Sequence, residues 1–144
     1  MGWTHYWNYP DELDVPTFAR AVSDSRRVLE ASLVALAGAD GTGRPTLTHE
    51  AIIFNSVASS GGEPFVFLRR NPGHPLRRRP WQFCKTEHLP YDRCVMAVLV
   101  VLQHHFGSRV TVASDGRETD WRPATELCRT VLGYDSGFTL APRG

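Results

Sequence analysis

Three stretches of the chain repeat apolar residues at the spacing of an amphipathic helix. They cover residues 14–38, 91–106 and 120–133, and each ends at or just before a glycine, the residue type that most often follows a helix. The apolar positions of the first stretch are Phe18, Val22, Val28, Leu29, Leu33 and Leu36. The second stretch is apolar nearly all round, so we expect it to be the most buried helix.

Four shorter segments have the residue types of β-strands. They are residues 3–9, 47–57, 65–68 and 109–113, in which aromatic and β-branched side chains are frequent. The turn residues 59–62, Ser-Ser-Gly-Gly, separate the second segment from the third, which predicts a β-hairpin.

The predicted order of elements is β-α-β-β-α-β-α. This is the βαββαβ pattern of ferredoxin-like folds followed by an additional C-terminal helix, so the expected class is α+β. With 144 residues the chain has the length of one domain. We assign residues 1–133 to that domain and expect residues 134–144 to form a loose tail.

The ferredoxin-like strand order, 4-1-3-2, predicts which loops meet at one edge of the sheet. The start of the first strand should lie beside the ends of the third and fourth strands and beside the loop 83–92 that leads into the second helix. This edge would collect Trp3, Thr4, His5, Arg69, Arg70 and Asp115. The pair His104-His105 should lie ~18 Å away, at the other end of the second helix.

Composition narrows the class of protein without naming a function. The chain is 42% hydrophobic and 22% charged, with a net charge of +1. It has no apolar run near the ~20 residues that span a bilayer, and its start has no pattern of a secretory signal. The three cysteines form no disulfide framework. We therefore expect a globular protein of the reducing cytoplasm.

The polar residues of the predicted edge offer a cation, hydroxyls, carboxylates and an imidazole. We take His5, Lys85, Asp92 and Asp115 as candidate catalytic residues, and Thr4, Arg69, Thr86 and Tyr91 as candidate ligand-binding residues. Such a set suits a small anionic ligand, such as a phosphate or nucleotide, with Lys85 as its counter-charge. It also suits acid–base chemistry with His5 or Asp92 as the base. Each residue equally has a structural explanation, as a helix cap, a turn residue or a core ring.

Two other features point to chemistry less directly. Cys84 lies beside Lys85, which would lower its pKa in a nucleophile, but the surrounding sequence favours a buried thiol. His104 and His105 diverge by ~100° around a helix, so a shared metal ion is disfavoured. No Cys or His spacing in the chain matches a zinc site, and no cofactor motif is present.

A basic block suggests an alternative function. Arg69, Arg70, Arg77, Arg78, Arg79 and Lys85 follow one another with no acidic residue between them. Together with nearby aromatic residues they could contact nucleic acid through its phosphates, or a partner protein. The alternative without a function is a solvated loop. Lys85 is the single lysine among sixteen cationic residues, so the arginines of this block can reflect a general preference of the proteome for arginine. A homodimer formed through the sheet is a further expectation.

Several short motifs occur together in this chain. They are Gly-Trp-Thr-His-Tyr-Trp at 2–7, Phe-Cys-Lys-Thr at 83–86 with Pro-Tyr-Asp at 90–92, His-His at 104–105 and Ser-Asp-Gly at 114–116. The set resembles small uncharacterised proteins of bacteria and their phages, and the resemblance covers most of the chain. It implies no particular activity. The loop 69–80 lies outside the shared pattern.

Overall fold

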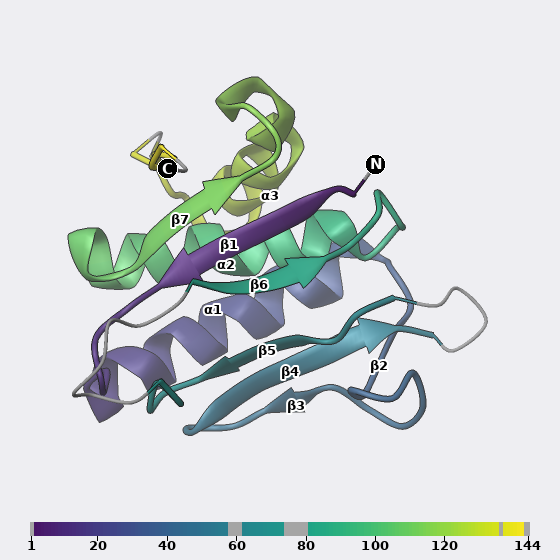
Figure 1. Cartoon of the computed structure of the whole chain (residues 1–144), viewed down its shortest axis with the longest axis horizontal. Helices are drawn as coiled ribbons and strands as arrows, with labels where there is room; N and C mark the ends of the chain where they lie inside the picture. The colour runs from purple at the N-terminus through teal and green to yellow at the C-terminus, as the bar shows by residue number, and fades with distance from the viewer. Residues whose placement is uncertain (1, 58–61, 74–80, 136, 143–144) are drawn as a thin grey trace.

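The computed structural model describes residues 2–57, 62–73, 81–135 and 137–142. The protein is an α+β structure in which helices pack against antiparallel strands (Figure 1). The elements in chain order are β1 (Thr4–Asn8), α1 (Val15–Ser32), β2 (Leu36–Ala37), β3 (Thr46–Leu47), β4 (Ala51–Ser56), β5 (Phe65–Leu68), β6 (Gln82–Lys85), α2 (Asp92–Phe106), η2 (Gly107–Arg109), β7 (Thr111–Ser114), η3 (Glu118–Trp121) and α3 (Arg122–Leu132). Among the described residues, no helix combines the length and the apolar character that crossing a membrane requires.

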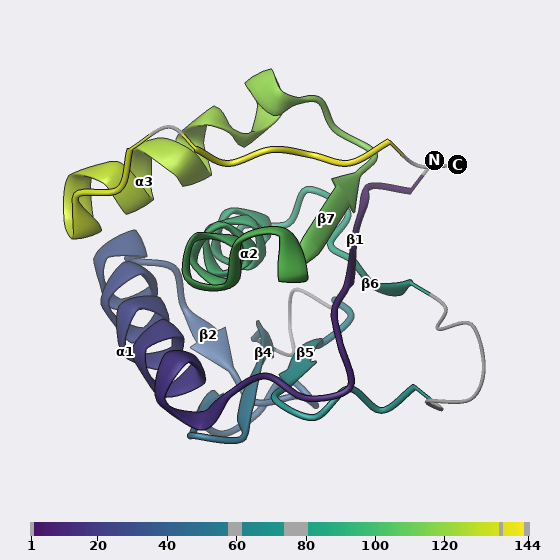
Figure 2. The same cartoon turned by 90° about the vertical axis from the view of Figure 1, so that its left-hand side faces the viewer.

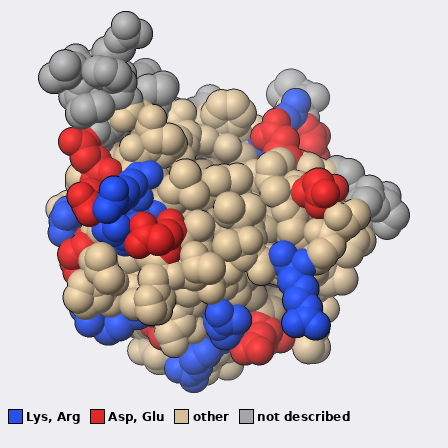
Figure 3. Space-filling view, turned by 90° about the horizontal axis from the view of Figure 1, so that it is seen from below, with Lys and Arg blue, Asp and Glu red and all other residues tan. Residues whose placement is uncertain are grey.

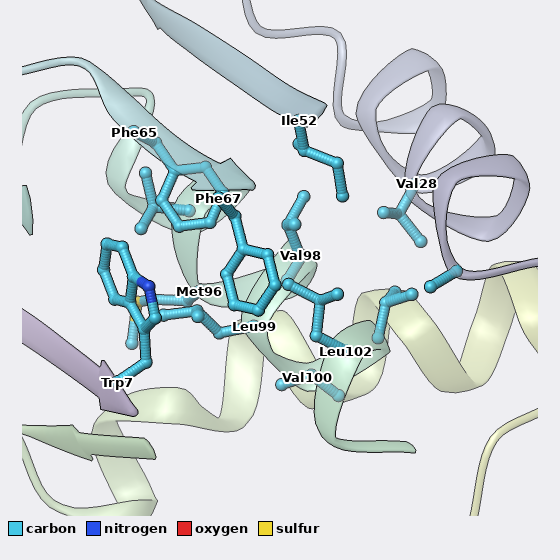
Figure 4. Close-up of a cluster of buried hydrophobic side chains, with 14 of the residues drawn as sticks. Trp7, Val28, Ile52, Phe65, Phe67, Met96, Val98, Leu99, Val100 and Leu102 are labelled. Atoms are coloured by element: carbon cyan, nitrogen blue, oxygen red, sulfur yellow. The ribbon is translucent and has the colours of Figure 1, made fainter. Parts of the chain in front are cut away.

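Helix α2 lies at the centre of the molecule. Figure 2 shows it end-on, with α1 and α3 beside it and the strands around its other sides. Every residue from Cys94 to Leu102 is buried, as the apolar pattern predicts. Trp7, Phe65 and Phe67 pack toward this helix around Met96 and Leu99 (Figure 4). Since α2 is enclosed on all sides, its polar ends are the places where it can meet other polar groups.

The strands form two antiparallel sheets. One has the order β6-β1-β7, and the other places β4 between β5 on one side and the short strands β2 and β3 on the other. The expected hairpin between residues 47–57 and 65–68 is present as the pair β4–β5, in the register Ala51↔Leu68 to Phe54↔Phe65. The two sheets adjoin where β6 runs beside β5 (Figure 1).

The strand order differs from the ferredoxin-like order that the sequence predicts. Residues 82–85, which we expected to form a loop, are strand β6 and occupy the place beside β1 that the prediction gives to β5. Strand β5 also runs in the same direction as β1 (Figure 1). The ends of the two strands lie together, and the Tyr9 hydroxyl after β1 donates to the Leu68 carbonyl at the end of β5, at 2.6 Å. The prediction required these two strands to run in opposite directions, so it was wrong on both counts.

Two further segments differ from expectation. Helix α1 ends at Ser32, before the predicted Gly38, because Leu33 adopts a left-handed backbone with φ 59° and the chain then turns into β2. The segment 137–142 is docked onto the fold, although we expected a loose tail. The side-chain amide of Gln103 donates to the Thr139 carbonyl and accepts from its amide, both at 2.9 Å, and the Phe138 ring stacks on Trp121.

The reversal of β5 moves Arg69 to the end of the sheet opposite the predicted site. The Arg69 guanidinium is almost fully buried and binds both carboxylate oxygens of Glu50 at 3.0 and 3.1 Å. It also donates to Glu12 at 2.9 Å and to the Leu13 carbonyl at 3.0 Å. Arg69 therefore connects β5 to the chain segment before α1, and its charge is used within the fold.

We expect Arg69→Ala to lower the melting temperature clearly more than Arg70→Ala. The first variant leaves Glu50, Glu12 and the Leu13 carbonyl without their donor, whereas the Arg70 side chain is exposed and lies 3.9 Å from Glu12. Thermal unfolding followed by circular dichroism measures both. Equal melting temperatures for the two variants would contradict the structural role of Arg69.

Candidate functional site

Strand register brings His5, Cys84 and Ser114 together at one end of α2. His5 is the second residue of the central strand β1, and its partners are Cys84 on β6 and Ser114 on β7. Because directly paired residues of antiparallel strands share a face, these three side chains point the same way, toward α2. Asp92, the first residue of α2, meets them there.

A continuous chain of hydrogen bonds joins Ser114, His5 and Asp92. The His5 Nε2 atom lies 2.7 Å from Asp92 Oδ1, and the His5 Nδ1 atom lies 2.8 Å from Ser114 Oγ. An ionised carboxylate can only accept, so Nε2 carries the proton and donates to Asp92. In the neutral ring Nδ1 is then an acceptor, and the Ser114 hydroxyl donates to it. For the neutral ring, these contacts assign both the tautomer of His5 and the direction of the chain.

Asp92 is held by two more donors. The Thr86 hydroxyl donates to Oδ1, and the Trp3 indole N–H donates to Oδ2 at 3.3 Å. Burial alone would raise the pKa of Asp92, but the hydrogen bonds from His5 and Thr86 outweigh it and hold the pKa below its ordinary value. Asp92 is therefore a carboxylate at neutral pH, as its role toward His5 requires.

Aromatic rings enclose this group of residues. The Trp121 ring packs edge-on against His5, with ring centroids 5.0 Å apart, and His5 is fully buried. The Trp3 ring stacks on His88 at 4.0 Å and lies so close to Gly116 that an added Cβ would be 2.6 Å from it. Ser114 keeps partial exposure to solvent. Asp92, at the other end of the chain of hydrogen bonds, is also partly exposed, with 15% of its side chain accessible.

The turn between β6 and α2 has an unusual backbone. Glu87 and His88 have positive φ values of 55° and 61°, a region that residues other than glycine rarely adopt. The Trp3 carbonyl holds the turn by accepting from the amides of Thr86 and Glu87, at 3.0 and 3.3 Å. This turn places Thr86 against Asp92 and His88 against Trp3.

Three of the predicted site residues lie at the same edge but outside the chain of hydrogen bonds. Asp115 accepts from the Thr4 amide at 3.0 Å and from the Tyr6 hydroxyl at 3.4 Å, so it ties β7 to β1. The Lys85 ammonium is half-exposed and forms an ion pair with Glu87 at 3.3 Å. The structure therefore brings these residues together with His5 as the sequence predicts, while their roles stay predictions.

Tyr91 and Cys84 belong to the packing behind the site. The Tyr91 hydroxyl donates to the Glu63 carbonyl at 2.6 Å, and the ring is fully buried. Cys84 is also fully buried, and burial raises the pKa of its thiol to about 12. The thiol is thus protonated at neutral pH, which removes the basis for a Cys84 nucleophile.

The arginines of the basic block do not form one surface in the described part of the chain. Arg69 is bound to Glu50 and Glu12, and only Arg70 is exposed. Arg77, Arg78 and Arg79 lie outside the described residues. On the face drawn in Figure 3, cationic side chains sit beside anionic ones around a broad area of other residues.

The paired histidines lie at the far end of α2, as the helix length predicts. The His105 Nε2 atom is 2.8 Å from Asp24, and the His104 ring stacks on Tyr134 at 3.6 Å. In the part of the chain that the structure describes, no group of three or more His, Cys, Asp or Glu residues is arranged to hold a metal ion.

The sequence reasoning missed Ser114 as a site residue. It was read as part of the turn before Gly116, although it ends a strand on the same face as His5. Once β7 and β1 are paired as neighbours, alternation along the strands places Ser114 opposite His5. Trp3 and His88 were missed as well, because only the turn at 86–89 brings them together.

A comparison of the chain with protein families, curated proteins and solved structures found no match.

The stability that Asp92 contributes should disappear in acid. Its pKa in the folded protein lies below the ordinary value of 3.8, so the contribution is complete above that pH and is lost as the pH falls through the folded pKa. We expect Asp92→Asn to unfold at lower urea concentration than wild type at pH 6, with the difference shrinking below pH 4. Glu30→Gln, at an exposed position on α1, is the control. A difference that stays constant from pH 6 to pH 2.5 would contradict the assignment.

Cys84 should resist alkylation in the folded protein. A thiol with a pKa of about 12 holds so little thiolate at pH 8 that its reaction with iodoacetamide should be about 10³-fold slower than in the urea-unfolded chain. Peptide mass spectrometry over a time course measures the rate. Modification of Cys84 at the same rate in both states would show that the thiol is accessible and ionised.

Proposed function

We propose that this protein is an enzyme that transfers or hydrolyses an acyl group of a small molecule, with Ser114 as nucleophile, His5 as general base and Asp92 as the group that orients His5. The observation that carries the proposal is the unbroken chain Ser114 Oγ–His5 Nδ1–His5 Nε2–Asp92 Oδ1, with distances of 2.8 and 2.7 Å. A nucleophile within hydrogen-bond reach of a base, which a third group orients, is the arrangement that activates a hydroxyl.

The chemistry follows from the direction of the hydrogen bonds. The Ser114 hydroxyl gives its proton to His5 Nδ1 as its oxygen attacks the acyl carbon, and Asp92 stabilises the imidazolium that forms. His5 then gives this proton to the leaving group as the acyl–leaving-group bond breaks. His5 Nδ1 next takes a proton from water as the water oxygen attacks the acyl carbon, and returns that proton to Ser114 Oγ as the acyl–oxygen bond breaks. Relative to the serine-protease triad the two ring nitrogens exchange roles, which the chemistry permits because either nitrogen can carry the proton.

We call the hydrogen-bonded residues Ser114, His5 and Asp92 the relay. Two features beside the relay support a functional rather than a purely structural role for it. The left-handed backbone at Glu87 and His88 costs on the order of 1–3 kcal/mol per residue, and such strain concentrates at active sites. The buried Trp121 indole N–H, which packs against His5, has no acceptor among the described residues. A buried donor without a partner is unfavourable, so the packing around His5 is not optimised for stability alone.

Access to the relay depends on Trp3. Its indole covers the site from His88 to Gly116, and its single hydrogen bond to Asp92 is long, at 3.3 Å. We propose that a substrate reaches Ser114 by displacing this ring, while His5 stays buried behind Trp121.

The charges around the site bear on the substrate. Lys85 is the candidate cation that lies at this edge of the sheet, and it is already paired with Glu87. Asp115 and Glu63 add negative charge on either side of β1, through their bonds to the amides of Thr4 and Lys85. This balance favours a neutral ester or thioester over a phosphorylated ligand. A substrate with one anionic group would place it at Lys85.

A fluorophosphonate probe tests the proposal directly, because it modifies only activated serine hydroxyls. We expect the wild-type protein to be labelled at Ser114 and the variant Ser114→Ala to remain unlabelled. Asp92→Asn should slow the labelling by a factor between about 10² and 10⁴, because His5 loses the acceptor that fixes its tautomer. In-gel fluorescence and peptide mass spectrometry give the rate and the position.

Ser108→Ala is the matched control, since Ser108 is an exposed serine just before the same strand and lies outside the relay. Labelling of the control at the wild-type rate, combined with loss in Ser114→Ala, would support the mechanism. If the wild-type protein is not labelled, and Ser114→Ala only lowers the melting temperature, the three residues form a structural network and the proposed function is wrong.

A further inference from the structure

A cavity of about 520 Å³ lies between the C-terminal half of α2, strand β7 and the docked segment 137–142. Its size falls within the range of roughly 300–1,000 Å³ that is usual for ligand pockets. Its walls are largely apolar. The apolar side chains among them are Val100, Val110, Val112, Phe138, Leu140 and Ala141. The cavity is separate from the relay, which lies at the opposite end of α2 and of β7.

Hydrogen bonds from α2 and β7 hold the C-terminal segment that forms one wall of the cavity. Gln103 holds the backbone of Thr139 with two hydrogen bonds, and the Ala141 amide donates to the Val112 carbonyl at 2.8 Å. Phe138 is anchored by stacking on Trp121, with ring centroids 4.8 Å apart. These contacts satisfy the backbone of the segment and set it at a fixed position over the cavity.

Three polar residues of the lining, His104, Tyr134 and Asp135, lie together. His104 stacks on Tyr134, and both line the cavity next to Asp135. Burial and the neighbouring His105 lower the pKa of His104, so its ring is neutral at pH 7 and offers one donor or one acceptor. Asp135 is then the charged group of the lining. A ligand with a donor next to these residues would be accepted, and an anionic ligand would be repelled.

We infer that this cavity is a second binding site, which takes a neutral and mainly apolar molecule, such as a fused aromatic ring system, with one O–H or N–H group directed to His104 and Asp135. The apolar walls would remove the rings from water, and the polar residues would fix their orientation. The inference does not depend on the proposed activity of Ser114.

Titration with 2-naphthol, a neutral bicyclic ring with one hydroxyl, tests the site, and ¹⁵N–¹H correlation spectra provide the readout. We expect saturable shifts of amide signals from lining residues such as Gly107, Val112 and Leu140, with Lys85 and Asp115 unaffected. The anion 2-naphthoate, which has the same rings, should bind about tenfold more weakly, a difference of ~1.4 kcal/mol. Absence of saturable shifts with 2-naphthol, or equal binding of the anion, would overturn the inference.

Thr125→Trp provides the blocking variant, because Thr125 lines the cavity from α3 and a large ring there would fill it. Thr130→Trp, at an exposed position on the same helix, is the matched control. We expect at least about tenfold weaker binding of 2-naphthol to the first variant and wild-type binding to the second. If Thr125→Trp does not fold, Gly137→Leu replaces it, since an added Cβ at this lining position meets no atom within 4 Å. Equal affinity for the blocking and control variants would exclude the cavity as the site.

Discussion

The burial of α2 on every side is the constraint on which the rest of the structure depends. A helix enclosed by two other helices and two sheets can keep a carboxylate at its first residue only if that carboxylate is fully hydrogen-bonded, because an unpaired buried charge is strongly unfavourable. Asp92 meets this condition through His5, Thr86 and Trp3. Each donor comes from a different part of the chain, so one carboxylate sets the positions of β1, of the turn after β6 and of the amino-terminal residues.

The same requirement gives the site its chemical character. When the neutral His5 ring donates from Nε2 to Asp92, its other nitrogen accepts, and strand pairing offers it the Ser114 hydroxyl. A purely structural network would need this last hydroxyl only as a hydrogen-bond donor to His5. Here Ser114, which carries the hydroxyl, is partly exposed, as is Asp92 at the other end of the network. Stability and reactivity therefore make the same demand on His5, and both fix its tautomer.

Local patterns in the sequence predicted the helices well, and long-range pairing explains what they could not predict. The apolar period defined α2, and glycine marked the end of α3. Strand β6 escaped notice because Gln82–Lys85 has only four residues with mixed polarity, and its identity depends on the pairing partner β1. The error in strand order then misplaced Arg69. In contrast, His5, Asp92 and Asp115 were placed at one edge correctly, because β1, β7 and α2 have the predicted directions.

The pairing of β1 has a consequence for the order of events during synthesis. This strand precedes both of its partners, β6 and β7, by more than 70 residues, and His5 and Ser114 are 109 residues apart in the chain. Until residues 82–85 have been made, β1 with its aromatic side chains has neither of these partners. Contacts of such sequence separation slow folding and leave an apolar strand exposed to aggregation in the meantime. Strand β1 is thus synthesised well before the strands that complete its sheet.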